Sequence, residues 1–247
     1  MTCRFATKMF YRPEHPRPRK IIEVMETSRT VYFWGLGKNT GKSVAVCQAM
    51  REARDAKKRM AVTSVGRDGE MFDEIYKTFA KPIMSFESGD IIITSERLLL
   101  DKNCTVVRRF ELPSAIGPIV AARANMPCHI EVAGPSTVDG LRTVRSWIAG
   151  AGIDIFLIDG ALERKAASLP DICDGIIVST GAAISEHMGD VLRQTQAAIE
   201  MAGMSTEDRI DGGKRIMTLP TEVLGSSLGK RGGLGKVRSK SLSLMIL

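Results

Sequence analysis

Features that mark membrane, secreted or disulfide-linked proteins are missing from this sequence. No apolar run approaches the roughly 20 residues that a membrane-spanning helix requires. The basic residues near the N-terminus are not followed by the apolar core of a secretory signal before Pro13. The five cysteines are odd in number and include no Cys-x-x-Cys pair, which disfavours a disulfide framework and a zinc site. We therefore expect a cytoplasmic protein with reduced cysteines and no membrane partner.

The excess of positive charge is confined to the two ends of the chain. The formal net charge is +7, but residues 1–20 and residues 230–247 each carry a net charge of +5. Residues 21–229 are therefore slightly acidic, with a net charge of −3. Because nucleic-acid binding depends on a basic face that displaces counterions, we expect no nucleic-acid partner for the folded part.

Short apolar runs alternate along the chain with longer stretches of helical periodicity. Apolar runs typical of buried strands lie at residues 30–34, 59–65, 129–133, 153–158 and 175–178. Helical patterns lie at residues 43–56, 70–80, 137–149 and 185–201. The pattern at residues 117–124 fits a helix or a strand. Strands separated by helices predict βαβ units, and hence a parallel sheet with helices on both faces.

We therefore predict one α/β domain with a doubly wound, mainly parallel sheet at residues 30–222. Residues 1–29 are predicted to form a basic N-terminal extension. Residues 223–247, rich in Gly, Ser and basic residues, are predicted to be either a flexible tail or a truncated end. Ligands of such sheets bind beyond the carboxyl ends of the strands, so the residues that follow the strands are the candidates for a site.

The most informative segment is the Gly-Leu-Gly-Lys-Asn-Thr-Gly-Lys-Ser sequence at residues 35–43, between a predicted strand and a predicted helix. Glycines let the backbone wrap closely around a phosphate, and the helix that follows presents its positive end to the same anion. Lys42 would reach the terminal phosphates, and the Ser43 hydroxyl would ligate Mg²⁺. The alternative is a Gly-rich turn without a ligand. The predicted nucleotide-binding residues here are Gly35, Gly37, Lys38, Asn39, Thr40, Gly41, Lys42, Ser43 and Val44.

A second candidate is Asp159, which follows the apolar run at residues 153–158. A buried strand that delivers one carboxylate at its end provides what a Mg²⁺–nucleotide site requires. We predict Lys42 and Asp159 as catalytic residues and Ser43, Asp159 and Asp68 as metal ligands. Asp-Gly sequences also begin ordinary turns, and the segment that contains Asp68 fits a plain turn equally well.

Together these motifs resemble a known family. The G-x5-GKS spacing of residues 35–43, with Asp159-Gly160-Ala161, is similar to the P-loop and the later Glu-Gly-Ala of the dethiobiotin synthetase-like group of P-loop NTPases, with Asp in place of Glu. The strict G-x4-GK[ST] spacing is missed, because its first glycine would fall on Leu36. A closer resemblance, to the nucleotide-binding subunits of lysine 5,6-aminomutase reactivases, lies in residues 61–70, 117–123 and 157–185.

The resemblance implies a P-loop NTPase fold and an ATPase that uses Mg²⁺ and reactivates a B12-dependent aminomutase. Its partner would be the aminomutase or a second reactivase subunit, and a homo-oligomer stays an open alternative. Thr180 is also predicted to bind the nucleotide. It lies where GTP-binding relatives often carry an Asn/Thr-Lys-x-Asp motif, and the missing carboxylate favours ATP. Two other functions stay open: a dethiobiotin synthetase-like enzyme that activates a carboxylate with ATP, and a non-catalytic binding or scaffold protein with an empty loop.

Overall fold

The computed structural model describes residues 20–65, 84–100, 103–112, 114, 117–160, 172–201, 208–211, 214–218 and 243–246. Two predicted features lie outside these residues, namely Asp68 as a metal ligand and the helix at residues 70–80. Most of the two basic terminal segments also lies outside them.

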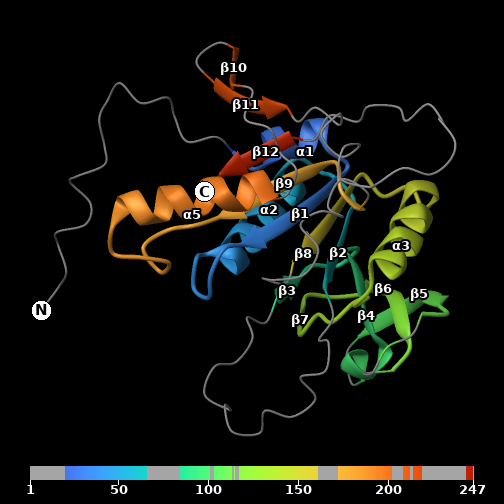
Figure 1. Cartoon of the computed structure of the whole chain (residues 1–247). Coiled ribbons are helices and arrows are strands. Elements are labelled where there is room, and N and C mark those ends of the chain that lie inside the picture. Colours follow the sequence, from blue (N-terminus) through green and yellow to red (C-terminus); the bar gives the residue numbers. More distant parts are fainter. Residues whose placement is uncertain are drawn as a thin grey trace, which may run out of the picture.

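The described strands form one large sheet and one small sheet (Figure 1). The strands of the large sheet are β1 (Thr30–Gly35), β2 (Met60–Ser64), β4 (Ile91–Ser95), β5 (Cys104–Phe110), β6 (Ile119–Ala124), β8 (Ile155–Asp159), β9 (Gly175–Ser179), β10 (Asp208–Asp211), β11 (Lys214–Thr218) and β12 (Ser243–Ile246). Their order across the sheet is β10-β11-β12-β9-β1-β8-β2-β4-β6-β5. The small sheet pairs β3 (Met84–Phe86) with β7 (Cys128–Ile130) in antiparallel fashion.

The centre of the large sheet is parallel, as the sequence predicts. All pairs from β12 across to β4 are parallel, whereas β10, β11, β5 and β6 form the antiparallel pairs of the described residues toward the two edges. Parallel strands need crossover connections, and the helical stretches between the apolar runs provide them. The prediction of an α/β fold with a mostly parallel sheet is therefore confirmed.

Helices cover both faces of this sheet. α1 (Ile22–Thr27) and α2 (Lys42–Asp55) pack on one face, and α3 (Val138–Gly150) and α5 (Met188–Met201) pack on the other. The side chains of β1 alternate accordingly, because Val31 and Phe33 join the core under α2, whereas Tyr32 and Trp34 join the core under α3 and α5. Strands that are buried on both faces read as continuous apolar runs, which explains the pattern in the sequence.

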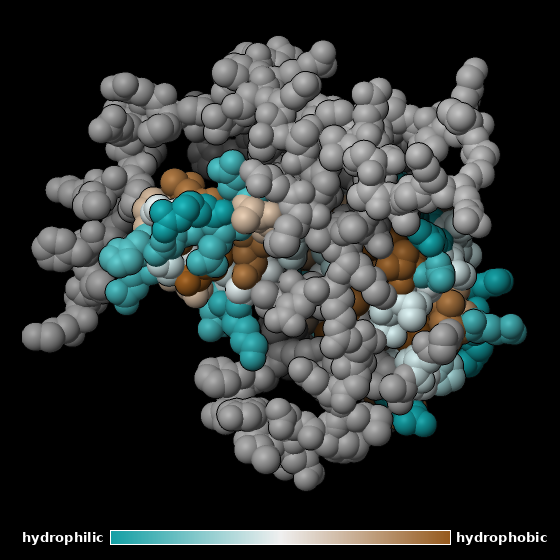
Figure 2. Space-filling model, viewed as in Figure 1, coloured by the Kyte–Doolittle hydropathy of each residue, from teal (hydrophilic) through white to brown (hydrophobic). Residues whose placement is uncertain are grey.

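The outer surface of α5 is partly apolar. Met188 and Leu192 are 57% and 62% exposed, and Figure 2 shows hydrophobic side chains among hydrophilic ones over this helix. In the part of the chain that the structure describes, no helix is long and apolar enough to cross a membrane.

Residues 132–134 lie between the ends of β2 and β4, which separate after their last paired residues. The N–H of Gly134 donates to the carbonyl of Ser64 at 3.0 Å, and the N–H of Ser95 donates to the carbonyl of Ala133 at 2.9 Å. The segment thus continues the sheet between two strands that no longer bond to each other. The strand predicted at residues 129–133 is accordingly divided, since β7 ends before this segment begins.

The other predicted boundaries agree with the structure within three residues, and residues 119–124 form a strand rather than a helix. Two folded elements lie within the predicted terminal segments. The buried residues of α1, Val24 and Met25, pack on the core, and β12 pairs in parallel with β9. The folded part therefore extends beyond both of the boundaries at residues 30 and 222.

Substitution of Gly134 by alanine is expected to destabilise the protein strongly. A Cβ at this position would lie 1.9 Å from Thr63 Oγ1 and 2.7 Å from the Ser64 carbonyl oxygen. Because the second of these atoms is backbone, we expect Gly134→Ala to lower the free energy of unfolding by about 3 kcal/mol in urea titrations.

The matched control is Gly150→Ala in α3, where a Cβ would meet no atom within 4 Å. Alanine is the better helix former, so this variant should be as stable as the wild type or gain up to about 1 kcal/mol. Equal effects of the two substitutions would contradict the close packing of residues 132–134 between the strands.

Candidate functional site

The predicted site lies where the connections of the sheet change direction. From β1 the chain passes through α2 to β2, on one side of β1, whereas β9 lies on its other side. Crevices form at such points beyond the carboxyl ends of the strands, and ligands of α/β sheets bind there. β1 and β8 are parallel neighbours, with Phe33 paired to Asp159, so the loop after β1 and the carboxylate at the end of β8 reach the same edge.

The loop between β1 and α2 leaves the first N–H groups of the helix uncapped. Asn39 and Gly41 have φ angles of 62° and 90°, and Gly41 is the N-cap of α2, with no side-chain cap. Thr40 Oγ1 donates to the Gly37 carbonyl at 3.0 Å and holds the loop together. Left-handed residues of this kind turn backbone N–H groups toward one side, and uncapped helix N-termini attract anions.

Two glycines lie where the loop folds back on the end of β1. A Cβ on Gly35 would lie 3.1 Å from Thr40 Oγ1 and 3.3 Å from Lys42 Cβ, and a Cβ on Gly37 would lie 3.3 Å from Thr40 Cγ2. Side chains at these two positions would occupy the inside of the turn. The loop is therefore compact on this side, and side chains at positions 35 and 37 would crowd Thr40.

Lys42 and Asp159 form an ion pair across this edge. Lys42 Nζ donates to Asp159 Oδ1, and the two residues are 117 positions apart in the sequence. The side chains are 21% and 12% exposed, so water screens their attraction less than it would at the surface. The structure therefore brings together the two residues that the sequence predicts as catalytic.

The backbone of Asp159 is held from both sides. Its carbonyl accepts the N–H of Val65, and the N–H of Gly160 donates to the Phe33 carbonyl, both at 2.9 Å. A Cβ on Gly160 would lie 2.3 Å from the ring of Tyr32, so only glycine allows this ring to pack against the chain beyond Asp159. In the sequence, the Asp-Gly pair fits a metal ligand at a strand end or an ordinary turn, and neither interpretation predicts this packing of the glycine against Tyr32.

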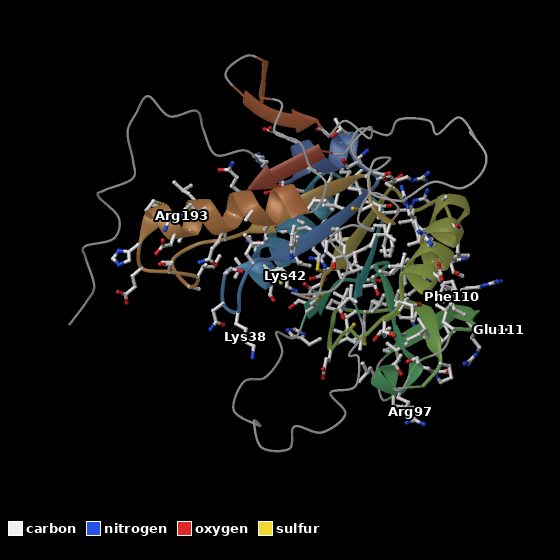
Figure 3. The ribbon with its side chains drawn as sticks, viewed as in Figure 1. Lys38, Lys42, Arg97, Phe110, Glu111 and Arg193 are labelled. Atoms are coloured by element: carbon white, nitrogen blue, oxygen red, sulfur yellow. The ribbon has the colours of Figure 1, made fainter. Side chains whose placement is uncertain are left out.

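The remaining predicted residues have less uniform surroundings. Ser43 is half-buried in the first turn of α2, beside Lys42. Lys38 is exposed, and Figure 3 shows its side chain pointing away from the sheet. Val44 is 74% exposed. The structure thus places the loop and Asp159 at the same edge of the sheet, whereas the side chains of Lys38 and Val44 point outward.

Thr180 follows β9, the other neighbour of β1, and is tied to α5. Its Oγ1 lies 2.9 Å from Thr195 Oγ1, which donates to the Val191 carbonyl at 2.7 Å. Because the proton of Thr195 is used in that bond, Thr180 is the donor to Thr195. Its hydroxyl oxygen keeps the capacity to accept a further hydrogen bond.

The buried Cys173 lies at the opposite edge of the sheet from this site, and its thiol is not expected to react. Cys173 is buried before β9, and burial raises the pKa of its thiol far above the usual range. A thiol that stays protonated is a poor nucleophile and a poor metal ligand. Among the described residues, no three His, Cys, Asp or Glu side chains lie close enough to hold a metal ion by themselves.

No protein-family model matches the chain, and no curated protein matches it either. The function is therefore inferred from the geometry of the loop and of Asp159.

The coupling between Lys42 and Asp159 can be measured by a double-mutant cycle. Removal of one partner leaves the other charge partly buried and uncompensated, so Lys42→Met and Asp159→Asn should each lower the free energy of unfolding. We expect the double variant to reveal a coupling of about 1–2 kcal/mol in urea titrations.

The exposed pair of Arg142 and Asp139, one helical turn apart in α3, provides the reference cycle. Its side chains are 47% and 88% exposed, so its coupling should stay below about 0.5 kcal/mol. A coupling between Lys42 and Asp159 no larger than this reference would show that the two side chains do not pair in solution.

Proposed function

We propose that the chain is an ATPase of the P-loop NTPase fold that binds Mg-ATP at residues 35–43. The observation that carries the proposal is the ion pair of Lys42 with Asp159, formed where an uncapped helix begins and two parallel strands end. A cation and a carboxylate at the positive end of a helix are what phosphoryl transfer requires of a protein.

The loop would bind the phosphates mainly through its backbone. The N–H groups of the first turn of α2 have no side-chain cap, and a Cβ at Gly35 or Gly37 would come within 3.3 Å of Thr40. Lys42 would neutralise the charge of the terminal phosphates. Catalysis of this kind depends on positioning and electrostatic stabilisation rather than on covalent chemistry.

The donor set suits Mg²⁺ better than a softer metal. Ser43 and Asp159 offer a hydroxyl and a carboxylate oxygen, and Mg²⁺ prefers oxygen ligands completed by phosphates and water. Asp68 is proposed as a further ligand on the sequence alone. When bound, Mg²⁺ supplies positive charge beside the reacting phosphate.

The ion pair also suggests how binding of nucleotide and metal would be linked. Lys42 can pair with a phosphate or with Asp159, and Asp159 can pair with Lys42 or with Mg²⁺. A phosphate that attracts Lys42 therefore leaves the carboxylate available to the metal. Each ligand would then strengthen the binding of the other.

A resemblance to reactivase subunits suggests the biological role of this ATPase. It lies in residues 61–70, 117–123 and 157–185. ATP hydrolysis would serve the maintenance of a B12-dependent aminomutase, in the cytoplasm and through contact with that enzyme or a second subunit. ATP is proposed over GTP because Ser179-Thr180-Gly181 contains no guanine-reading carboxylate.

Thermal unfolding with Mg-ATP, Mg-GTP and no nucleotide tests the proposed activity. A ligand that binds only the folded protein at a hundredfold excess over its Kd stabilises it by about 2.7 kcal/mol. We expect a shift of this size with Mg-ATP in the wild type and its loss in Lys42→Ala, because the variant lacks the cation for the phosphates.

The control variant is Lys58→Ala, an exposed lysine before β2 at the opposite edge of the sheet, which should keep the full shift. An unchanged shift in Lys42→Ala, or no shift in the wild type with either nucleotide, would refute the proposed site. If hydrolysis is stimulated by a small carboxylic acid and not by a protein partner, the chain is instead a carboxylate-activating enzyme.

A further inference from the structure

A buried hydroxyl without a partner lies next to the proposed nucleotide site. Ser179 ends β9 and is 1% exposed, and among the described residues its Oγ has no hydrogen-bond partner. Buried polar groups are nearly always paired, because an unpaired one gives up its bonds to water without replacement. This hydroxyl therefore destabilises the arrangement in which it is found.

The position of Ser179 connects it to the phosphate loop. Ser179 is paired with Gly35 in the register of β9 and β1, and its carbonyl accepts the N–H of Leu36 at 3.0 Å. Paired residues of neighbouring strands lie about 5 Å apart. Ser179 is thus next to the first residue of the loop.

The side chain of Ser179 also lies on the loop's side of the sheet. Ile177 belongs to the core under α2, whereas Ile176 and Val178 belong to the opposite core. Ser179 follows Ile177 by two positions and so shares its face. On this face a Cβ at Gly35 would approach Thr40 and Lys42, so the loop covers the face here.

We propose that Ser179 is a positioning residue of the nucleotide site, and this inference rests on the proposed binding of Mg-ATP. Its hydroxyl gains a hydrogen-bond partner in the arrangement that residues 35–43 adopt around the phosphates. The unpaired hydroxyl raises the free energy of the loop without phosphate, and the new bond lowers the free energy of the loop around it. Both effects favour binding.

This role predicts an unusual combination of effects for Ser179→Ala. The substitution removes an unpaired polar group, so the protein without nucleotide should unfold at the same temperature as the wild type or higher. It also removes the bond formed on binding, so the Kd and KM for Mg-ATP should rise about fivefold to twentyfold with little change in kcat. Ser179→Thr, which keeps the hydroxyl, should restore most of the affinity.

The control is Ser28→Ala at the opposite edge of the sheet. Ser28 is also 1% exposed, but its hydroxyl donates to the Asp174 carbonyl at 3.2 Å. This variant loses a bond that exists without nucleotide. It should therefore unfold at a lower temperature and bind Mg-ATP with unchanged affinity.

Two measurements test the role of Ser179: calorimetric titration with Mg-ATP and thermal unfolding without nucleotide. Both are made on the wild type, Ser179→Ala, Ser179→Thr, Ser28→Ala and Lys42→Ala. Wild-type affinity in Ser179→Ala, with binding lost in Lys42→Ala, would overturn the role of Ser179 and leave the proposed function standing. Destabilisation of Ser179→Ala as large as that of Ser28→Ala would show that the hydroxyl is already paired without nucleotide, and would overturn the inference. No binding in the wild type would overturn the proposed function together with this inference.

Discussion

β1 is hydrogen-bonded to β8 on one side and to β9 on the other, and the whole candidate site depends on this pairing. The register places Phe33 beside Asp159 and Gly35 beside Ser179. Because all three strands run in the same direction, their carboxyl ends deliver the loop, a carboxylate and a hydroxyl to one edge. Apolar side chains on both faces of β1 fix the register, since a slip by one residue would exchange the two cores.

Several features that cost stability lie at this edge, and two more lie at the far end of α2, where Lys57 has a positive φ and the buried Arg54 Nε has no partner among the described residues. Asn39 has a positive φ, the first turn of α2 is uncapped, and the Ser179 hydroxyl has no partner among the described residues. The ion pair of Lys42 and Asp159 also removes two charges from most of their water. Natural proteins keep such features mainly at functional sites, where a ligand completes the missing interactions. Elsewhere in the core, buried Thr63 and Ser64 donate hydrogen bonds to backbone carbonyls.

The central strands could be predicted because residues buried on both faces leave a strong signal, as in the Ile-Phe-Leu-Ile sequence before Asp159. The loop is predictable for a similar reason, since glycines between a strand and a helix form a local pattern. Pairing between distant segments leaves no such pattern. The position of residues 132–134 between β2 and β4 depends on Ser64 and Ser95, far away in the sequence. α1 has only six residues, too few to show periodicity, and nothing in the sequence indicates that the Ser179 hydroxyl is buried.

The central proposal is an exchange of partners. Lys42 pairs with Asp159 or with a phosphate, and Asp159 pairs with Lys42 or with Mg²⁺. Calorimetric titration of ATP into wild type and Asp159→Asn, with and without Mg²⁺, tests it most directly. If the claim holds, the variant binds ATP without Mg²⁺ more tightly than the wild type, because Lys42 has lost its competing carboxylate, and it gains little affinity when Mg²⁺ is added. Weaker binding of free ATP by the variant, together with an undiminished gain from Mg²⁺, would contradict the claim.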